Sequence, residues 1–371
     1  MSTIDKAAVQ ALRDRARREV DDGLLPSAQI ALAHNGELVH VETFGDATND
    51  TRYIVYSATK AFVAGAIWAL IGDGLVDVSK AVIDYVPEFG TNGKDVITVE
   101  QVMLHTSGFP LAPMAVLAGA ASAGRVEAFQ RWRLNHEPGT VHQYHPSSAH
   151  WVLAEIIERV THQDFRDVVE QRVTTPAGLE RVLGGVAHIP AELIEVGEPA
   201  TAAELQAAFG VPELDVGEVT TTALLGFNDP GARAVGVPGG GGVMRAQDLA
   251  MYYQAVLHNP GDMWNAEVLH DAKTNVRNHF PDVMTGVPAN RTLGLVQAGG
   301  DGKSHFRGMG RGVSAQAIGH NGAKGQIAWG DPVTGLSFGY CTNGLDAHQV
   351  REPRRTTAIA TLAAKCAGLT G

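Results

Sequence analysis

The chain has 371 residues, a formal net charge of -11 at pH 7, and 44% hydrophobic against 19% charged residues. This composition allows a large core and excludes global disorder, and the acidic balance argues against a general nucleic-acid or anionic-membrane surface. Two cysteines, Cys341 and Cys366, are too few for a disulfide framework or a zinc site of four thiolates.

The amino-terminal segment predicts an amphipathic helix. Its sequence, MSTIDKAAVQALRDRARREV, is polar and lacks the apolar stretch of a secretory signal. Since no run of about 18 apolar residues occurs anywhere, we expect no membrane-spanning helix. These features together predict a cytoplasmic protein.

A β-hairpin is expected next, over residues 27–44. Asn35-Gly36 stands between two β-prone runs, and both central positions of the favoured hairpin turn need positive φ. A short segment at 52–55 then leads into a stretch that is apolar on all sides. This stretch predicts a helix buried in the interior, ended by the glycines at 72 and 74.

Helical pieces broken by proline and glycine fill the chain from about residue 75 to 235. They are predicted at 99–104, 125–134, 150–160 and 165–173. The remaining third is predicted to comprise a glycine tract at 239–242, a helix at 246–257, strands at 325–329 and 336–342 around a turn, and a helix at 355–366.

Strands near both ends with helices between them predict an α+β fold. We expect one antiparallel sheet built from both chain termini and flanked by helices, with an inserted helical lobe. The whole chain, 1–371, is then a single domain of two lobes. Residues 1–56 and 245–371 form the α/β sheet lobe, and residues 57–244 form the mainly helical lobe.

Ser57-Ala58-Thr59-Lys60 opens the predicted buried helix. Residues at i and i+3 share a helical face, so the Ser57 hydroxyl and the Lys60 amine lie within reach of each other. A serine hydroxyl needs an adjacent base, and burial lowers the pKa of a lysine so that it can accept a proton. The pattern indicates a serine nucleophile with a lysine base, although a chance pair remains the alternative at this point.

Several further motifs follow in a particular order. They are Leu104-His105-Thr106-Ser107-Gly108, Glu137-Pro138-Gly139 before Tyr144, the helical stretch 153–160, Gly239–Gly242 ahead of Asp248-Leu249-Ala250, Gly319-His320-Asn321-Gly322, Asp331-Pro332 and Thr342-Asn343. With Ser57-x-x-Lys60, this order resembles the serine β-lactamase-like group: class C β-lactamases, DD-peptidases and family VIII carboxylesterases. The resemblance covers roughly residues 23–345 and implies a β-lactamase/transpeptidase-like fold.

The resemblance also implies a role for each candidate site residue. Ser57 is the acylated nucleophile, and Lys60 with Tyr144 forms the base pair that moves its proton. The backbone amides of Ser57 and Ala323 form the oxyanion hole. The triplet His320-Asn321-Gly322 binds substrate, and neither a metal nor a cofactor is implied. Without the resemblance, Tyr144 would be interpreted as a tyrosine of the core. The triplet His320-Asn321-Gly322 would be interpreted as a hairpin turn.

Two departures from the pattern favour the esterase branch of this group. Tyr144-His145-Pro146 replaces the usual Tyr-x-Asn, so the amide that binds a substrate side chain is missing. His320-Asn321-Gly322 replaces Lys-Thr-Gly, and a largely neutral imidazole attracts a carboxylate less than a lysine does. Both departures weaken the case for a penicillin or cephalosporin substrate.

We therefore expect a serine hydrolase that forms an acyl-enzyme, acting as a carboxylesterase on short to medium acyl esters. A β-lactamase, D-amino peptidase or other amide hydrolase or transacylase on the same scaffold is the first alternative. A catalytically silent binding module is the second, and the intact Ser57, Lys60 and Tyr144 argue against it. The expected partner is a small-molecule ester or amide; the oligomeric state and the roles of His105 and His145 stay open.

Two other segments have competing interpretations. Gly335-Leu336-Ser337-Phe338-Gly339 matches the nucleophile elbow of α/β-hydrolases, but here a turn precedes the serine and a strand follows it, which is the wrong context. The apolar segment 109–117 either lines an acyl pocket or packs inside the helical lobe.

Overall fold

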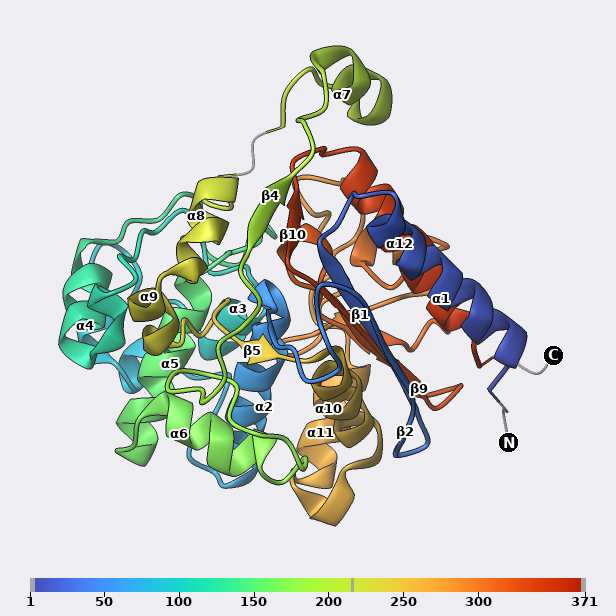
Figure 1. Cartoon of the computed structure of the whole chain (residues 1–371). Helices are drawn as coiled ribbons and strands as arrows, with labels where there is room; N and C mark the ends of the chain where they lie inside the picture. The colour runs from blue at the N-terminus through green and yellow to red at the C-terminus, as the bar shows by residue number, and fades with distance from the viewer. Residues whose placement is uncertain (1–3, 215–216, 368–371) are drawn as a thin grey trace.

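The computed structural model describes residues 4–214 and 217–367. Its centre is a six-stranded sheet with the strand order β2-β1-β9-β8-β7-β6, and all neighbours are antiparallel. The strands are β1 (Ser27–His34), β2 (Glu37–Gly45), β6 (Val296–Gln297), β7 (Ile318–Gly319), β8 (Ile327–Asp331) and β9 (Leu336–Thr342). Since β1 pairs with β9, the two ends of the chain meet in the sheet as predicted (Figure 1).

The predicted hairpin is confirmed. Asn35 and Gly36 have φ of 52° and 89°, the left-handed values that a tight hairpin turn requires. β1 continues into the middle of the sheet, and successive side chains alternate between its faces. Ile30 and Leu32 belong to the core on one face, and Ala31 belongs to the core on the other.

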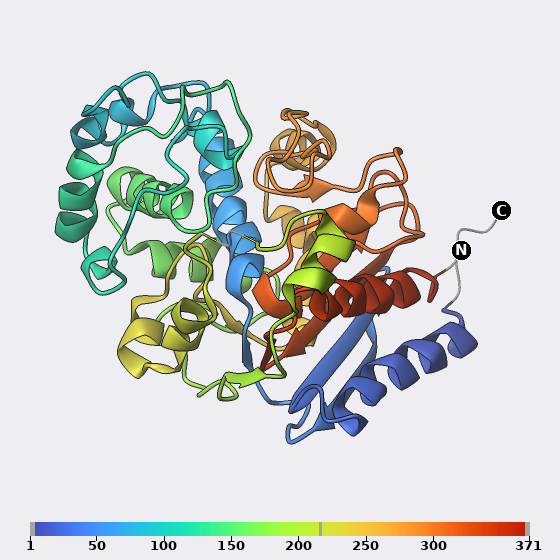
Figure 2. The same ribbon diagram turned by 90° about the horizontal axis from the view of Figure 1, so that it is seen from above.

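Helices cover both faces of the sheet. α1 (Lys6–Asp21) and α12 (Arg351–Ala364) pack on one face and against each other, as Figure 2 shows from above. α10 (Ala246–His258) packs on the opposite face against β1, β8 and β9. The inner strands β1, β8 and β9 are therefore buried on both sides, whereas most of the edge strand β2 is exposed or half-buried.

The predicted buried helix is α2 (Thr59–Gly72), in which every residue from Thr59 to Leu70 is buried. It runs between the sheet and the other helices (Figure 2). Those helices are α3 (Val99–Met103), α4 (Ser122–Arg131), α5 (Ser148–Thr161), α6 (Phe165–Val169), α8 (Thr221–Leu225) and α9 (Pro230–Val235). α11 (Ala266–Thr274) also contacts α2 and lies below α10 in Figure 1. The π-helical turn Glu170–Thr174 follows α6 within the predicted helix 165–173.

Two small sheets connect the helices to the main sheet. β3 (Tyr53–Ile54) pairs antiparallel with β5 (Val243–Met244), and β4 (Ile194–Val196) pairs parallel with β10 (Gly344–Asp346). α7 (Ala202–Phe209) follows β4 and protrudes from the body at the top of Figure 1. Among the described residues, no helix is both long enough and apolar enough to cross a membrane.

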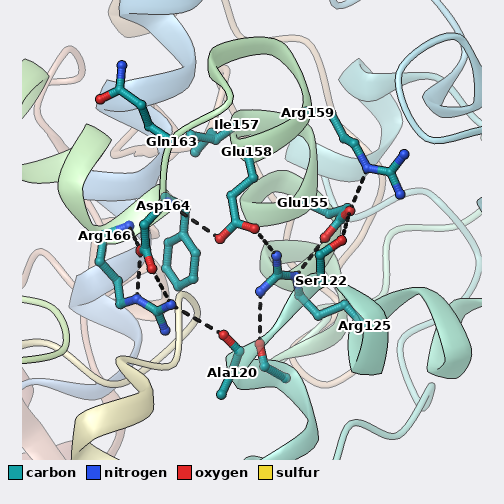
Figure 3. A network of polar contacts seen from close by, with 12 residues as sticks. Ala120, Ser122, Arg125, Glu155, Ile157, Glu158, Arg159, Gln163, Asp164 and Arg166 are labelled. Carbon is teal, nitrogen blue, oxygen red and sulfur yellow. Dashed lines mark hydrogen bonds and ion pairs between the residues drawn. The ribbon is translucent and has the colours of Figure 1, made fainter.

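A network of paired charges holds the helical lobe together (Figure 3). The buried Arg125 donates to Glu155 (2.8 Å) and to Glu158. Glu155 also accepts from Ser122 at 2.7 Å and from Arg159 at 2.8 Å. Buried charges are tolerated when they are paired in this way. Ser122, Glu155, Glu158 and Arg159 border a cavity of about 650 Å³, and these side chains bond to one another or to Arg125.

Candidate active site

A strained turn presents Ser57. The chain leaves β3 and passes through the 3₁₀ turn Tyr56–Ala58 directly into α2. Tyr56 has φ of 45°, which is unusual for a residue with a side chain and is held by burial of its ring, edge-on to Phe227 at 5.9 Å. The turn places Ser57 in the wall of a cleft.

Lys60 lies one turn further along and is fully buried. Its ammonium nitrogen is 3.2 Å from Ser57 Oγ, and it donates to the carbonyls of Pro146 and Gly239 at 2.6 Å each. Burial lowers the pKa of Lys60 below the ordinary value of 10.5. The amine is thus fixed beside the hydroxyl, and burial favours its neutral, proton-accepting form.

Tyr144 lies beside this pair with its hydroxyl unbonded. The buried hydroxyl has no hydrogen-bond partner among the described residues. Lys60 Nζ and Arg291 Cζ each lie 5.2 Å from the centroid of the Tyr144 ring, and the His105 ring is 4.7 Å away. The phenol oxygen therefore lies in the cleft without a partner, next to the Lys60 amine and the Arg291 guanidinium.

The glycine tract at 239–242 packs against the start of α2. A Cβ on Gly239 would lie 3.3 Å from Lys60 Nζ, and one on Gly242 would lie 2.6 Å from Thr59 Oγ1. The Gly242 amide donates to that same hydroxyl at 2.9 Å. The tract is a close-packed turn that supplies an acceptor to Lys60.

Gly322 places the 320–323 segment against the residues that precede Ser57. A Cβ on Gly322 would lie 2.0 Å from the carbonyl oxygen of Val55, a contact that only glycine allows. Ala323 then begins a 3₁₀ turn, and Ser57 lies in another. Lys324 inside the second turn has a left-handed φ of 56°, and both Ser57 and Ala323 line the cleft.

His320 and Asn321 differ in what their side chains contact. The buried His320 ring lies 6.0 Å from the Tyr144 ring, and its Nε2 has no partner among the described residues. Burial and the charges of Arg291 and Lys60 lower the pKa of His320 well below 6.5, so the ring is neutral. Both polar atoms of Asn321 instead bond to backbone, donating to Gly308 at 2.7 Å and accepting from Ala328 at 3.0 Å.

The cleft between these segments has a volume of about 390 Å³. Ser57, Tyr144, Arg291, His320 and Ala323 line it. Its apolar wall is formed by Val219, Met284, Val287, Pro288, Ala289, Val296 and Phe306.

The proposed acyl-pocket role of residues 109–117 is wrong, because none of them lines this cleft. Phe109 is fully buried against Phe89 and Trp132, and Leu111 and Leu117 are exposed to solvent. Phe109 and Ala112 belong to the hydrophobic core, and Met114 and Val116 pack against it. The apolar wall comes mainly from 284–296, which carries no recognisable motif.

Two buried histidines, His105 and His145, bond to the segments on either side of Tyr144. His145 Nε2 accepts from the Phe109 amide at 3.2 Å and contacts Ser107 Oγ at 3.1 Å, while its Nδ1 lies 2.6 Å from the Gln143 carbonyl. The His145 amide donates to His105 Nδ1 at 3.2 Å. These contacts position the segment that carries Tyr144. Among the described residues, no three His, Cys, Asp or Glu side chains are grouped to hold a metal ion.

The α/β-hydrolase interpretation of Ser337 is excluded by its position. Ser337 is fully buried inside β9, and its hydroxyl lies 2.8 Å from both the Ala250 carbonyl and Gln254 Nε2. A nucleophile elbow needs an exposed serine between a strand and a helix.

Comparisons with known proteins agree with this geometry. The chain is 27% identical over 329 residues to the esterase/beta-lactamase LipL of Mycobacterium tuberculosis, covering 80% of this chain and 70% of that protein. A crystal structure of a family VIII carboxylesterase superposes with a TM-score of 0.75 at 24% identity, covering 97% and 99% of the two chains. A penicillin-binding protein homologue from Caulobacter crescentus gives a TM-score of 0.74 at 20% identity, covering 98% and 99%.

These likenesses confirm the α+β, transpeptidase-like fold and the expected resemblance. The sequence model of the beta-lactamase family matches residues 12–363, nearly the whole chain. The protein belongs to the beta-lactamase family.

Proposed function

We propose that the protein is a serine hydrolase that cleaves carboxylic esters of short to medium apolar acids through an acyl-enzyme on Ser57. The observation that carries the proposal is the contact of 3.2 Å between Lys60 Nζ and Ser57 Oγ inside a cleft that also holds Tyr144. A buried amine beside a hydroxyl at a cleft wall is the arrangement that nucleophilic catalysis requires.

Acylation begins when Ser57 Oγ attacks the ester carbonyl carbon. Its proton passes to the Lys60–Tyr144 pair, and the carbonyl oxygen becomes an oxyanion bound by the amides of Ser57 and Ala323. The bond between the carbonyl carbon and the alcohol oxygen then breaks. The pair returns the proton to the leaving alkoxide, which departs as the alcohol.

Deacylation repeats these steps with water. The Lys60–Tyr144 pair takes a proton from the water, whose oxygen attacks the acyl carbon. The same two amides stabilise the second oxyanion. The bond to Ser57 Oγ breaks and the pair reprotonates that oxygen, so the enzyme returns to its starting state with the free acid released.

The lining of the cleft supports an apolar acyl group. Its apolar side chains, Met284, Val287 and Val296 among them, face the same cavity as Ser57. Each buried methylene of a substrate contributes about 0.8 kcal/mol, or a three- to fourfold gain in kcat/KM per carbon. The names of LipL and of the carboxylesterase structure, two of its relatives, agree with ester hydrolysis.

A fluorophosphonate probe and a series of 4-nitrophenyl esters test the proposal. The probe should add its mass to the peptide that contains Ser57, with the Ser337→Ala variant labelled like the unmodified protein. From acetyl to hexanoyl, kcat/KM should rise with chain length. Labelling elsewhere would refute the nucleophile, and a flat ester series beside faster hydrolysis of the cephalosporin nitrocefin would favour amide hydrolysis instead.

A further inference from the structure

Arg291 is a buried cation in the cleft whose guanidinium has no hydrogen-bond or ion-pair partner among the described residues. Only 8% of the residue is exposed, and it lines the same cavity as Ser57. Nε and Nη1 have no hydrogen-bond partner, and no ion pair joins the guanidinium to any carboxylate in the described residues. The face of the Tyr144 ring lies 5.2 Å from Cζ.

The other charged groups lining the cleft are already engaged. Arg307 pairs with Asp301 at 2.6 Å and donates to the carbonyls of Pro288 and Ala298. Asp282 accepts from the amides of Met284 and Thr285 at 3.0 Å each and lies 3.6 Å from the nearest ring nitrogen of His142.

The remaining titratable groups near Arg291 do not neutralise it. Burial, with the Arg291 charge as a further cause, lowers the pKa values of the surrounding imidazoles, and they are therefore neutral: His105, His142, His145, His150 and His320. Lys60 is no counter-charge either, because neither form of an amine is negative. The Asp282 carboxylate acts on Arg291 only through space.

The backbone holds Arg291 in place from both sides. Its amide donates to the Asn278 carbonyl at 3.1 Å, and its carbonyl accepts from the Arg277 amide at 2.9 Å. A further bridge joins it to Val296. An arginine stays protonated in proteins, and a buried charge without a partner is costly. A fixed, charged and unsatisfied guanidinium in a cleft is suited to an anionic ligand that supplies the missing acceptors.

We infer that Arg291 binds a carboxylate of the substrate, so that the cleft selects esters that carry a negative charge as well as an apolar chain. This inference rests on the proposed function of the same cleft. The positive charge that binds this carboxylate does not come from His320, which is neutral. It comes from Arg291, in a different segment of the chain. The carboxylate belongs either to the acyl part, as in a monoester of a dicarboxylic acid, or to the leaving alcohol, as in an acylated hydroxybenzoate.

Two matched pairs of esters separate these sources. The first pair is mono-4-nitrophenyl adipate and the corresponding adipamate, which differ by carboxylate against primary amide at the end of the acyl chain. The second pair is 3-butyryloxybenzoate and 3-butyryloxybenzamide, which differ in the same way on the leaving side. The anionic member of one pair should have a kcat/KM about tenfold to a hundredfold above its neutral partner.

Variants then assign this preference to Arg291. In Arg291→Gln, the ratio of kcat/KM between the anionic and the neutral ester should fall to about one. In Arg291→Lys, part of this preference should remain, because the charge is kept without the planar guanidinium. Arg354→Gln is the matched control, since it removes one exposed positive charge outside the cleft. The inference would be overturned if Arg291→Gln lowered kcat/KM equally for the anionic and the neutral ester of a pair. It would also be overturned if the unmodified protein hydrolysed both esters of each pair with the same kcat/KM.

Equilibrium binding separates this inference from the proposed function. In the Ser57→Ala variant, calorimetry should show that adipate or benzoate binds with higher affinity than adipamide or benzamide. Adding Arg291→Gln to this variant should abolish the difference in affinity. Carboxylate binding without ester hydrolysis would refute the proposed function alone. Hydrolysis of neutral esters without carboxylate binding would refute the subsite alone.

Discussion

Gly322 lies so close to Val55 that a methyl group in place of its hydrogen would come 2.0 Å from the Val55 carbonyl oxygen. Its φ and ψ of -100° and 161° are open to any residue, so the requirement for glycine is steric. The contact joins the segment that ends in Ala323 to the turn that carries Ser57. The proposed oxyanion hole depends on this separation.

Gly322→Ala should therefore impair catalysis much more than folding. Separating the two segments by a few tenths of an ångström or more misplaces one amide, and a misplacement near 1 Å can cost about a hundredfold in rate. Ester kcat/KM and thermal unfolding check this. Gly300→Ala is the control, because its added Cβ would meet nothing closer than 3.9 Å; equal activity of the two variants would contradict the prediction.

Replacing each of the two candidate nucleophiles, Ser57 and Ser337, by alanine should affect different properties, catalysis in one case and stability in the other. Ser57→Ala should lower kcat by several orders of magnitude, because the nucleophile is removed, and leave the fold intact. Ser337→Ala should keep kcat and lower the free energy of unfolding by about 1–3 kcal/mol, because the buried contacts of Ser337 with Ala250 and Gln254 are lost. Denaturant unfolding and turnover of one ester measure both. An inactive Ser337→Ala protein would reverse the assignment.

The elements that sequence predicted best are those with strong local signals. The Asn35-Gly36 turn requires positive φ at both positions, and α2 is apolar on all sides because every side is buried. β6 and β7 have two residues each, too few for an alternating pattern to show. The pairing of β4 with β10 joins residues distant in the chain, so nothing local indicates it.

The same distinction applies to the site. Ser57, Lys60, Tyr144 and the 320–323 segment stand in motifs whose order carries information. Arg291 stands in no motif, and its importance arises from burial and from missing partners, which only the folded structure reveals. The apolar segment 109–117 shows the converse, because apolar composition alone does not distinguish a pocket wall from a packed interior.

Lys60→Ala and Tyr144→Phe should be strongly non-additive. Each should reduce kcat/KM severely, and the double variant should be little worse than the worse single one, since groups that move one proton act as a unit. The pH profile should rise and level off below the ordinary lysine pKa of 10.5, because burial lowers the pKa of Lys60 and the base must be unprotonated. Multiplied losses in the double variant would show that the two side chains serve separate steps.

Acid should destabilise the fold through its buried histidines, and His145 allows a precise measurement. Burial lowers the pKa of His145 to about 3, whereas an unfolded histidine takes up a proton near pH 6.5. Between these values the unfolded state binds one more proton, so the free energy of unfolding falls by about 1.4 kcal/mol for each pH unit of acidification. The structure shows why the folded protein resists protonation: His145 Nε2 already accepts from the Phe109 amide.

His145→Asn should remove this proton uptake. Denaturant unfolding at pH 6.0, 5.0 and 4.0 gives the free energy of unfolding as a function of pH. In His145→Asn, this free energy should fall less steeply on acidification than in the unmodified protein, by about 1.4 kcal/mol per pH unit. His270→Asn, the same replacement at an exposed position, serves as the control. Other buried histidines with lowered pKa values, His105 and His150, keep the remaining slope steep in every variant. Parallel curves for His145→Asn and His270→Asn would show that His145 is not protonated on unfolding in this range, against the structure.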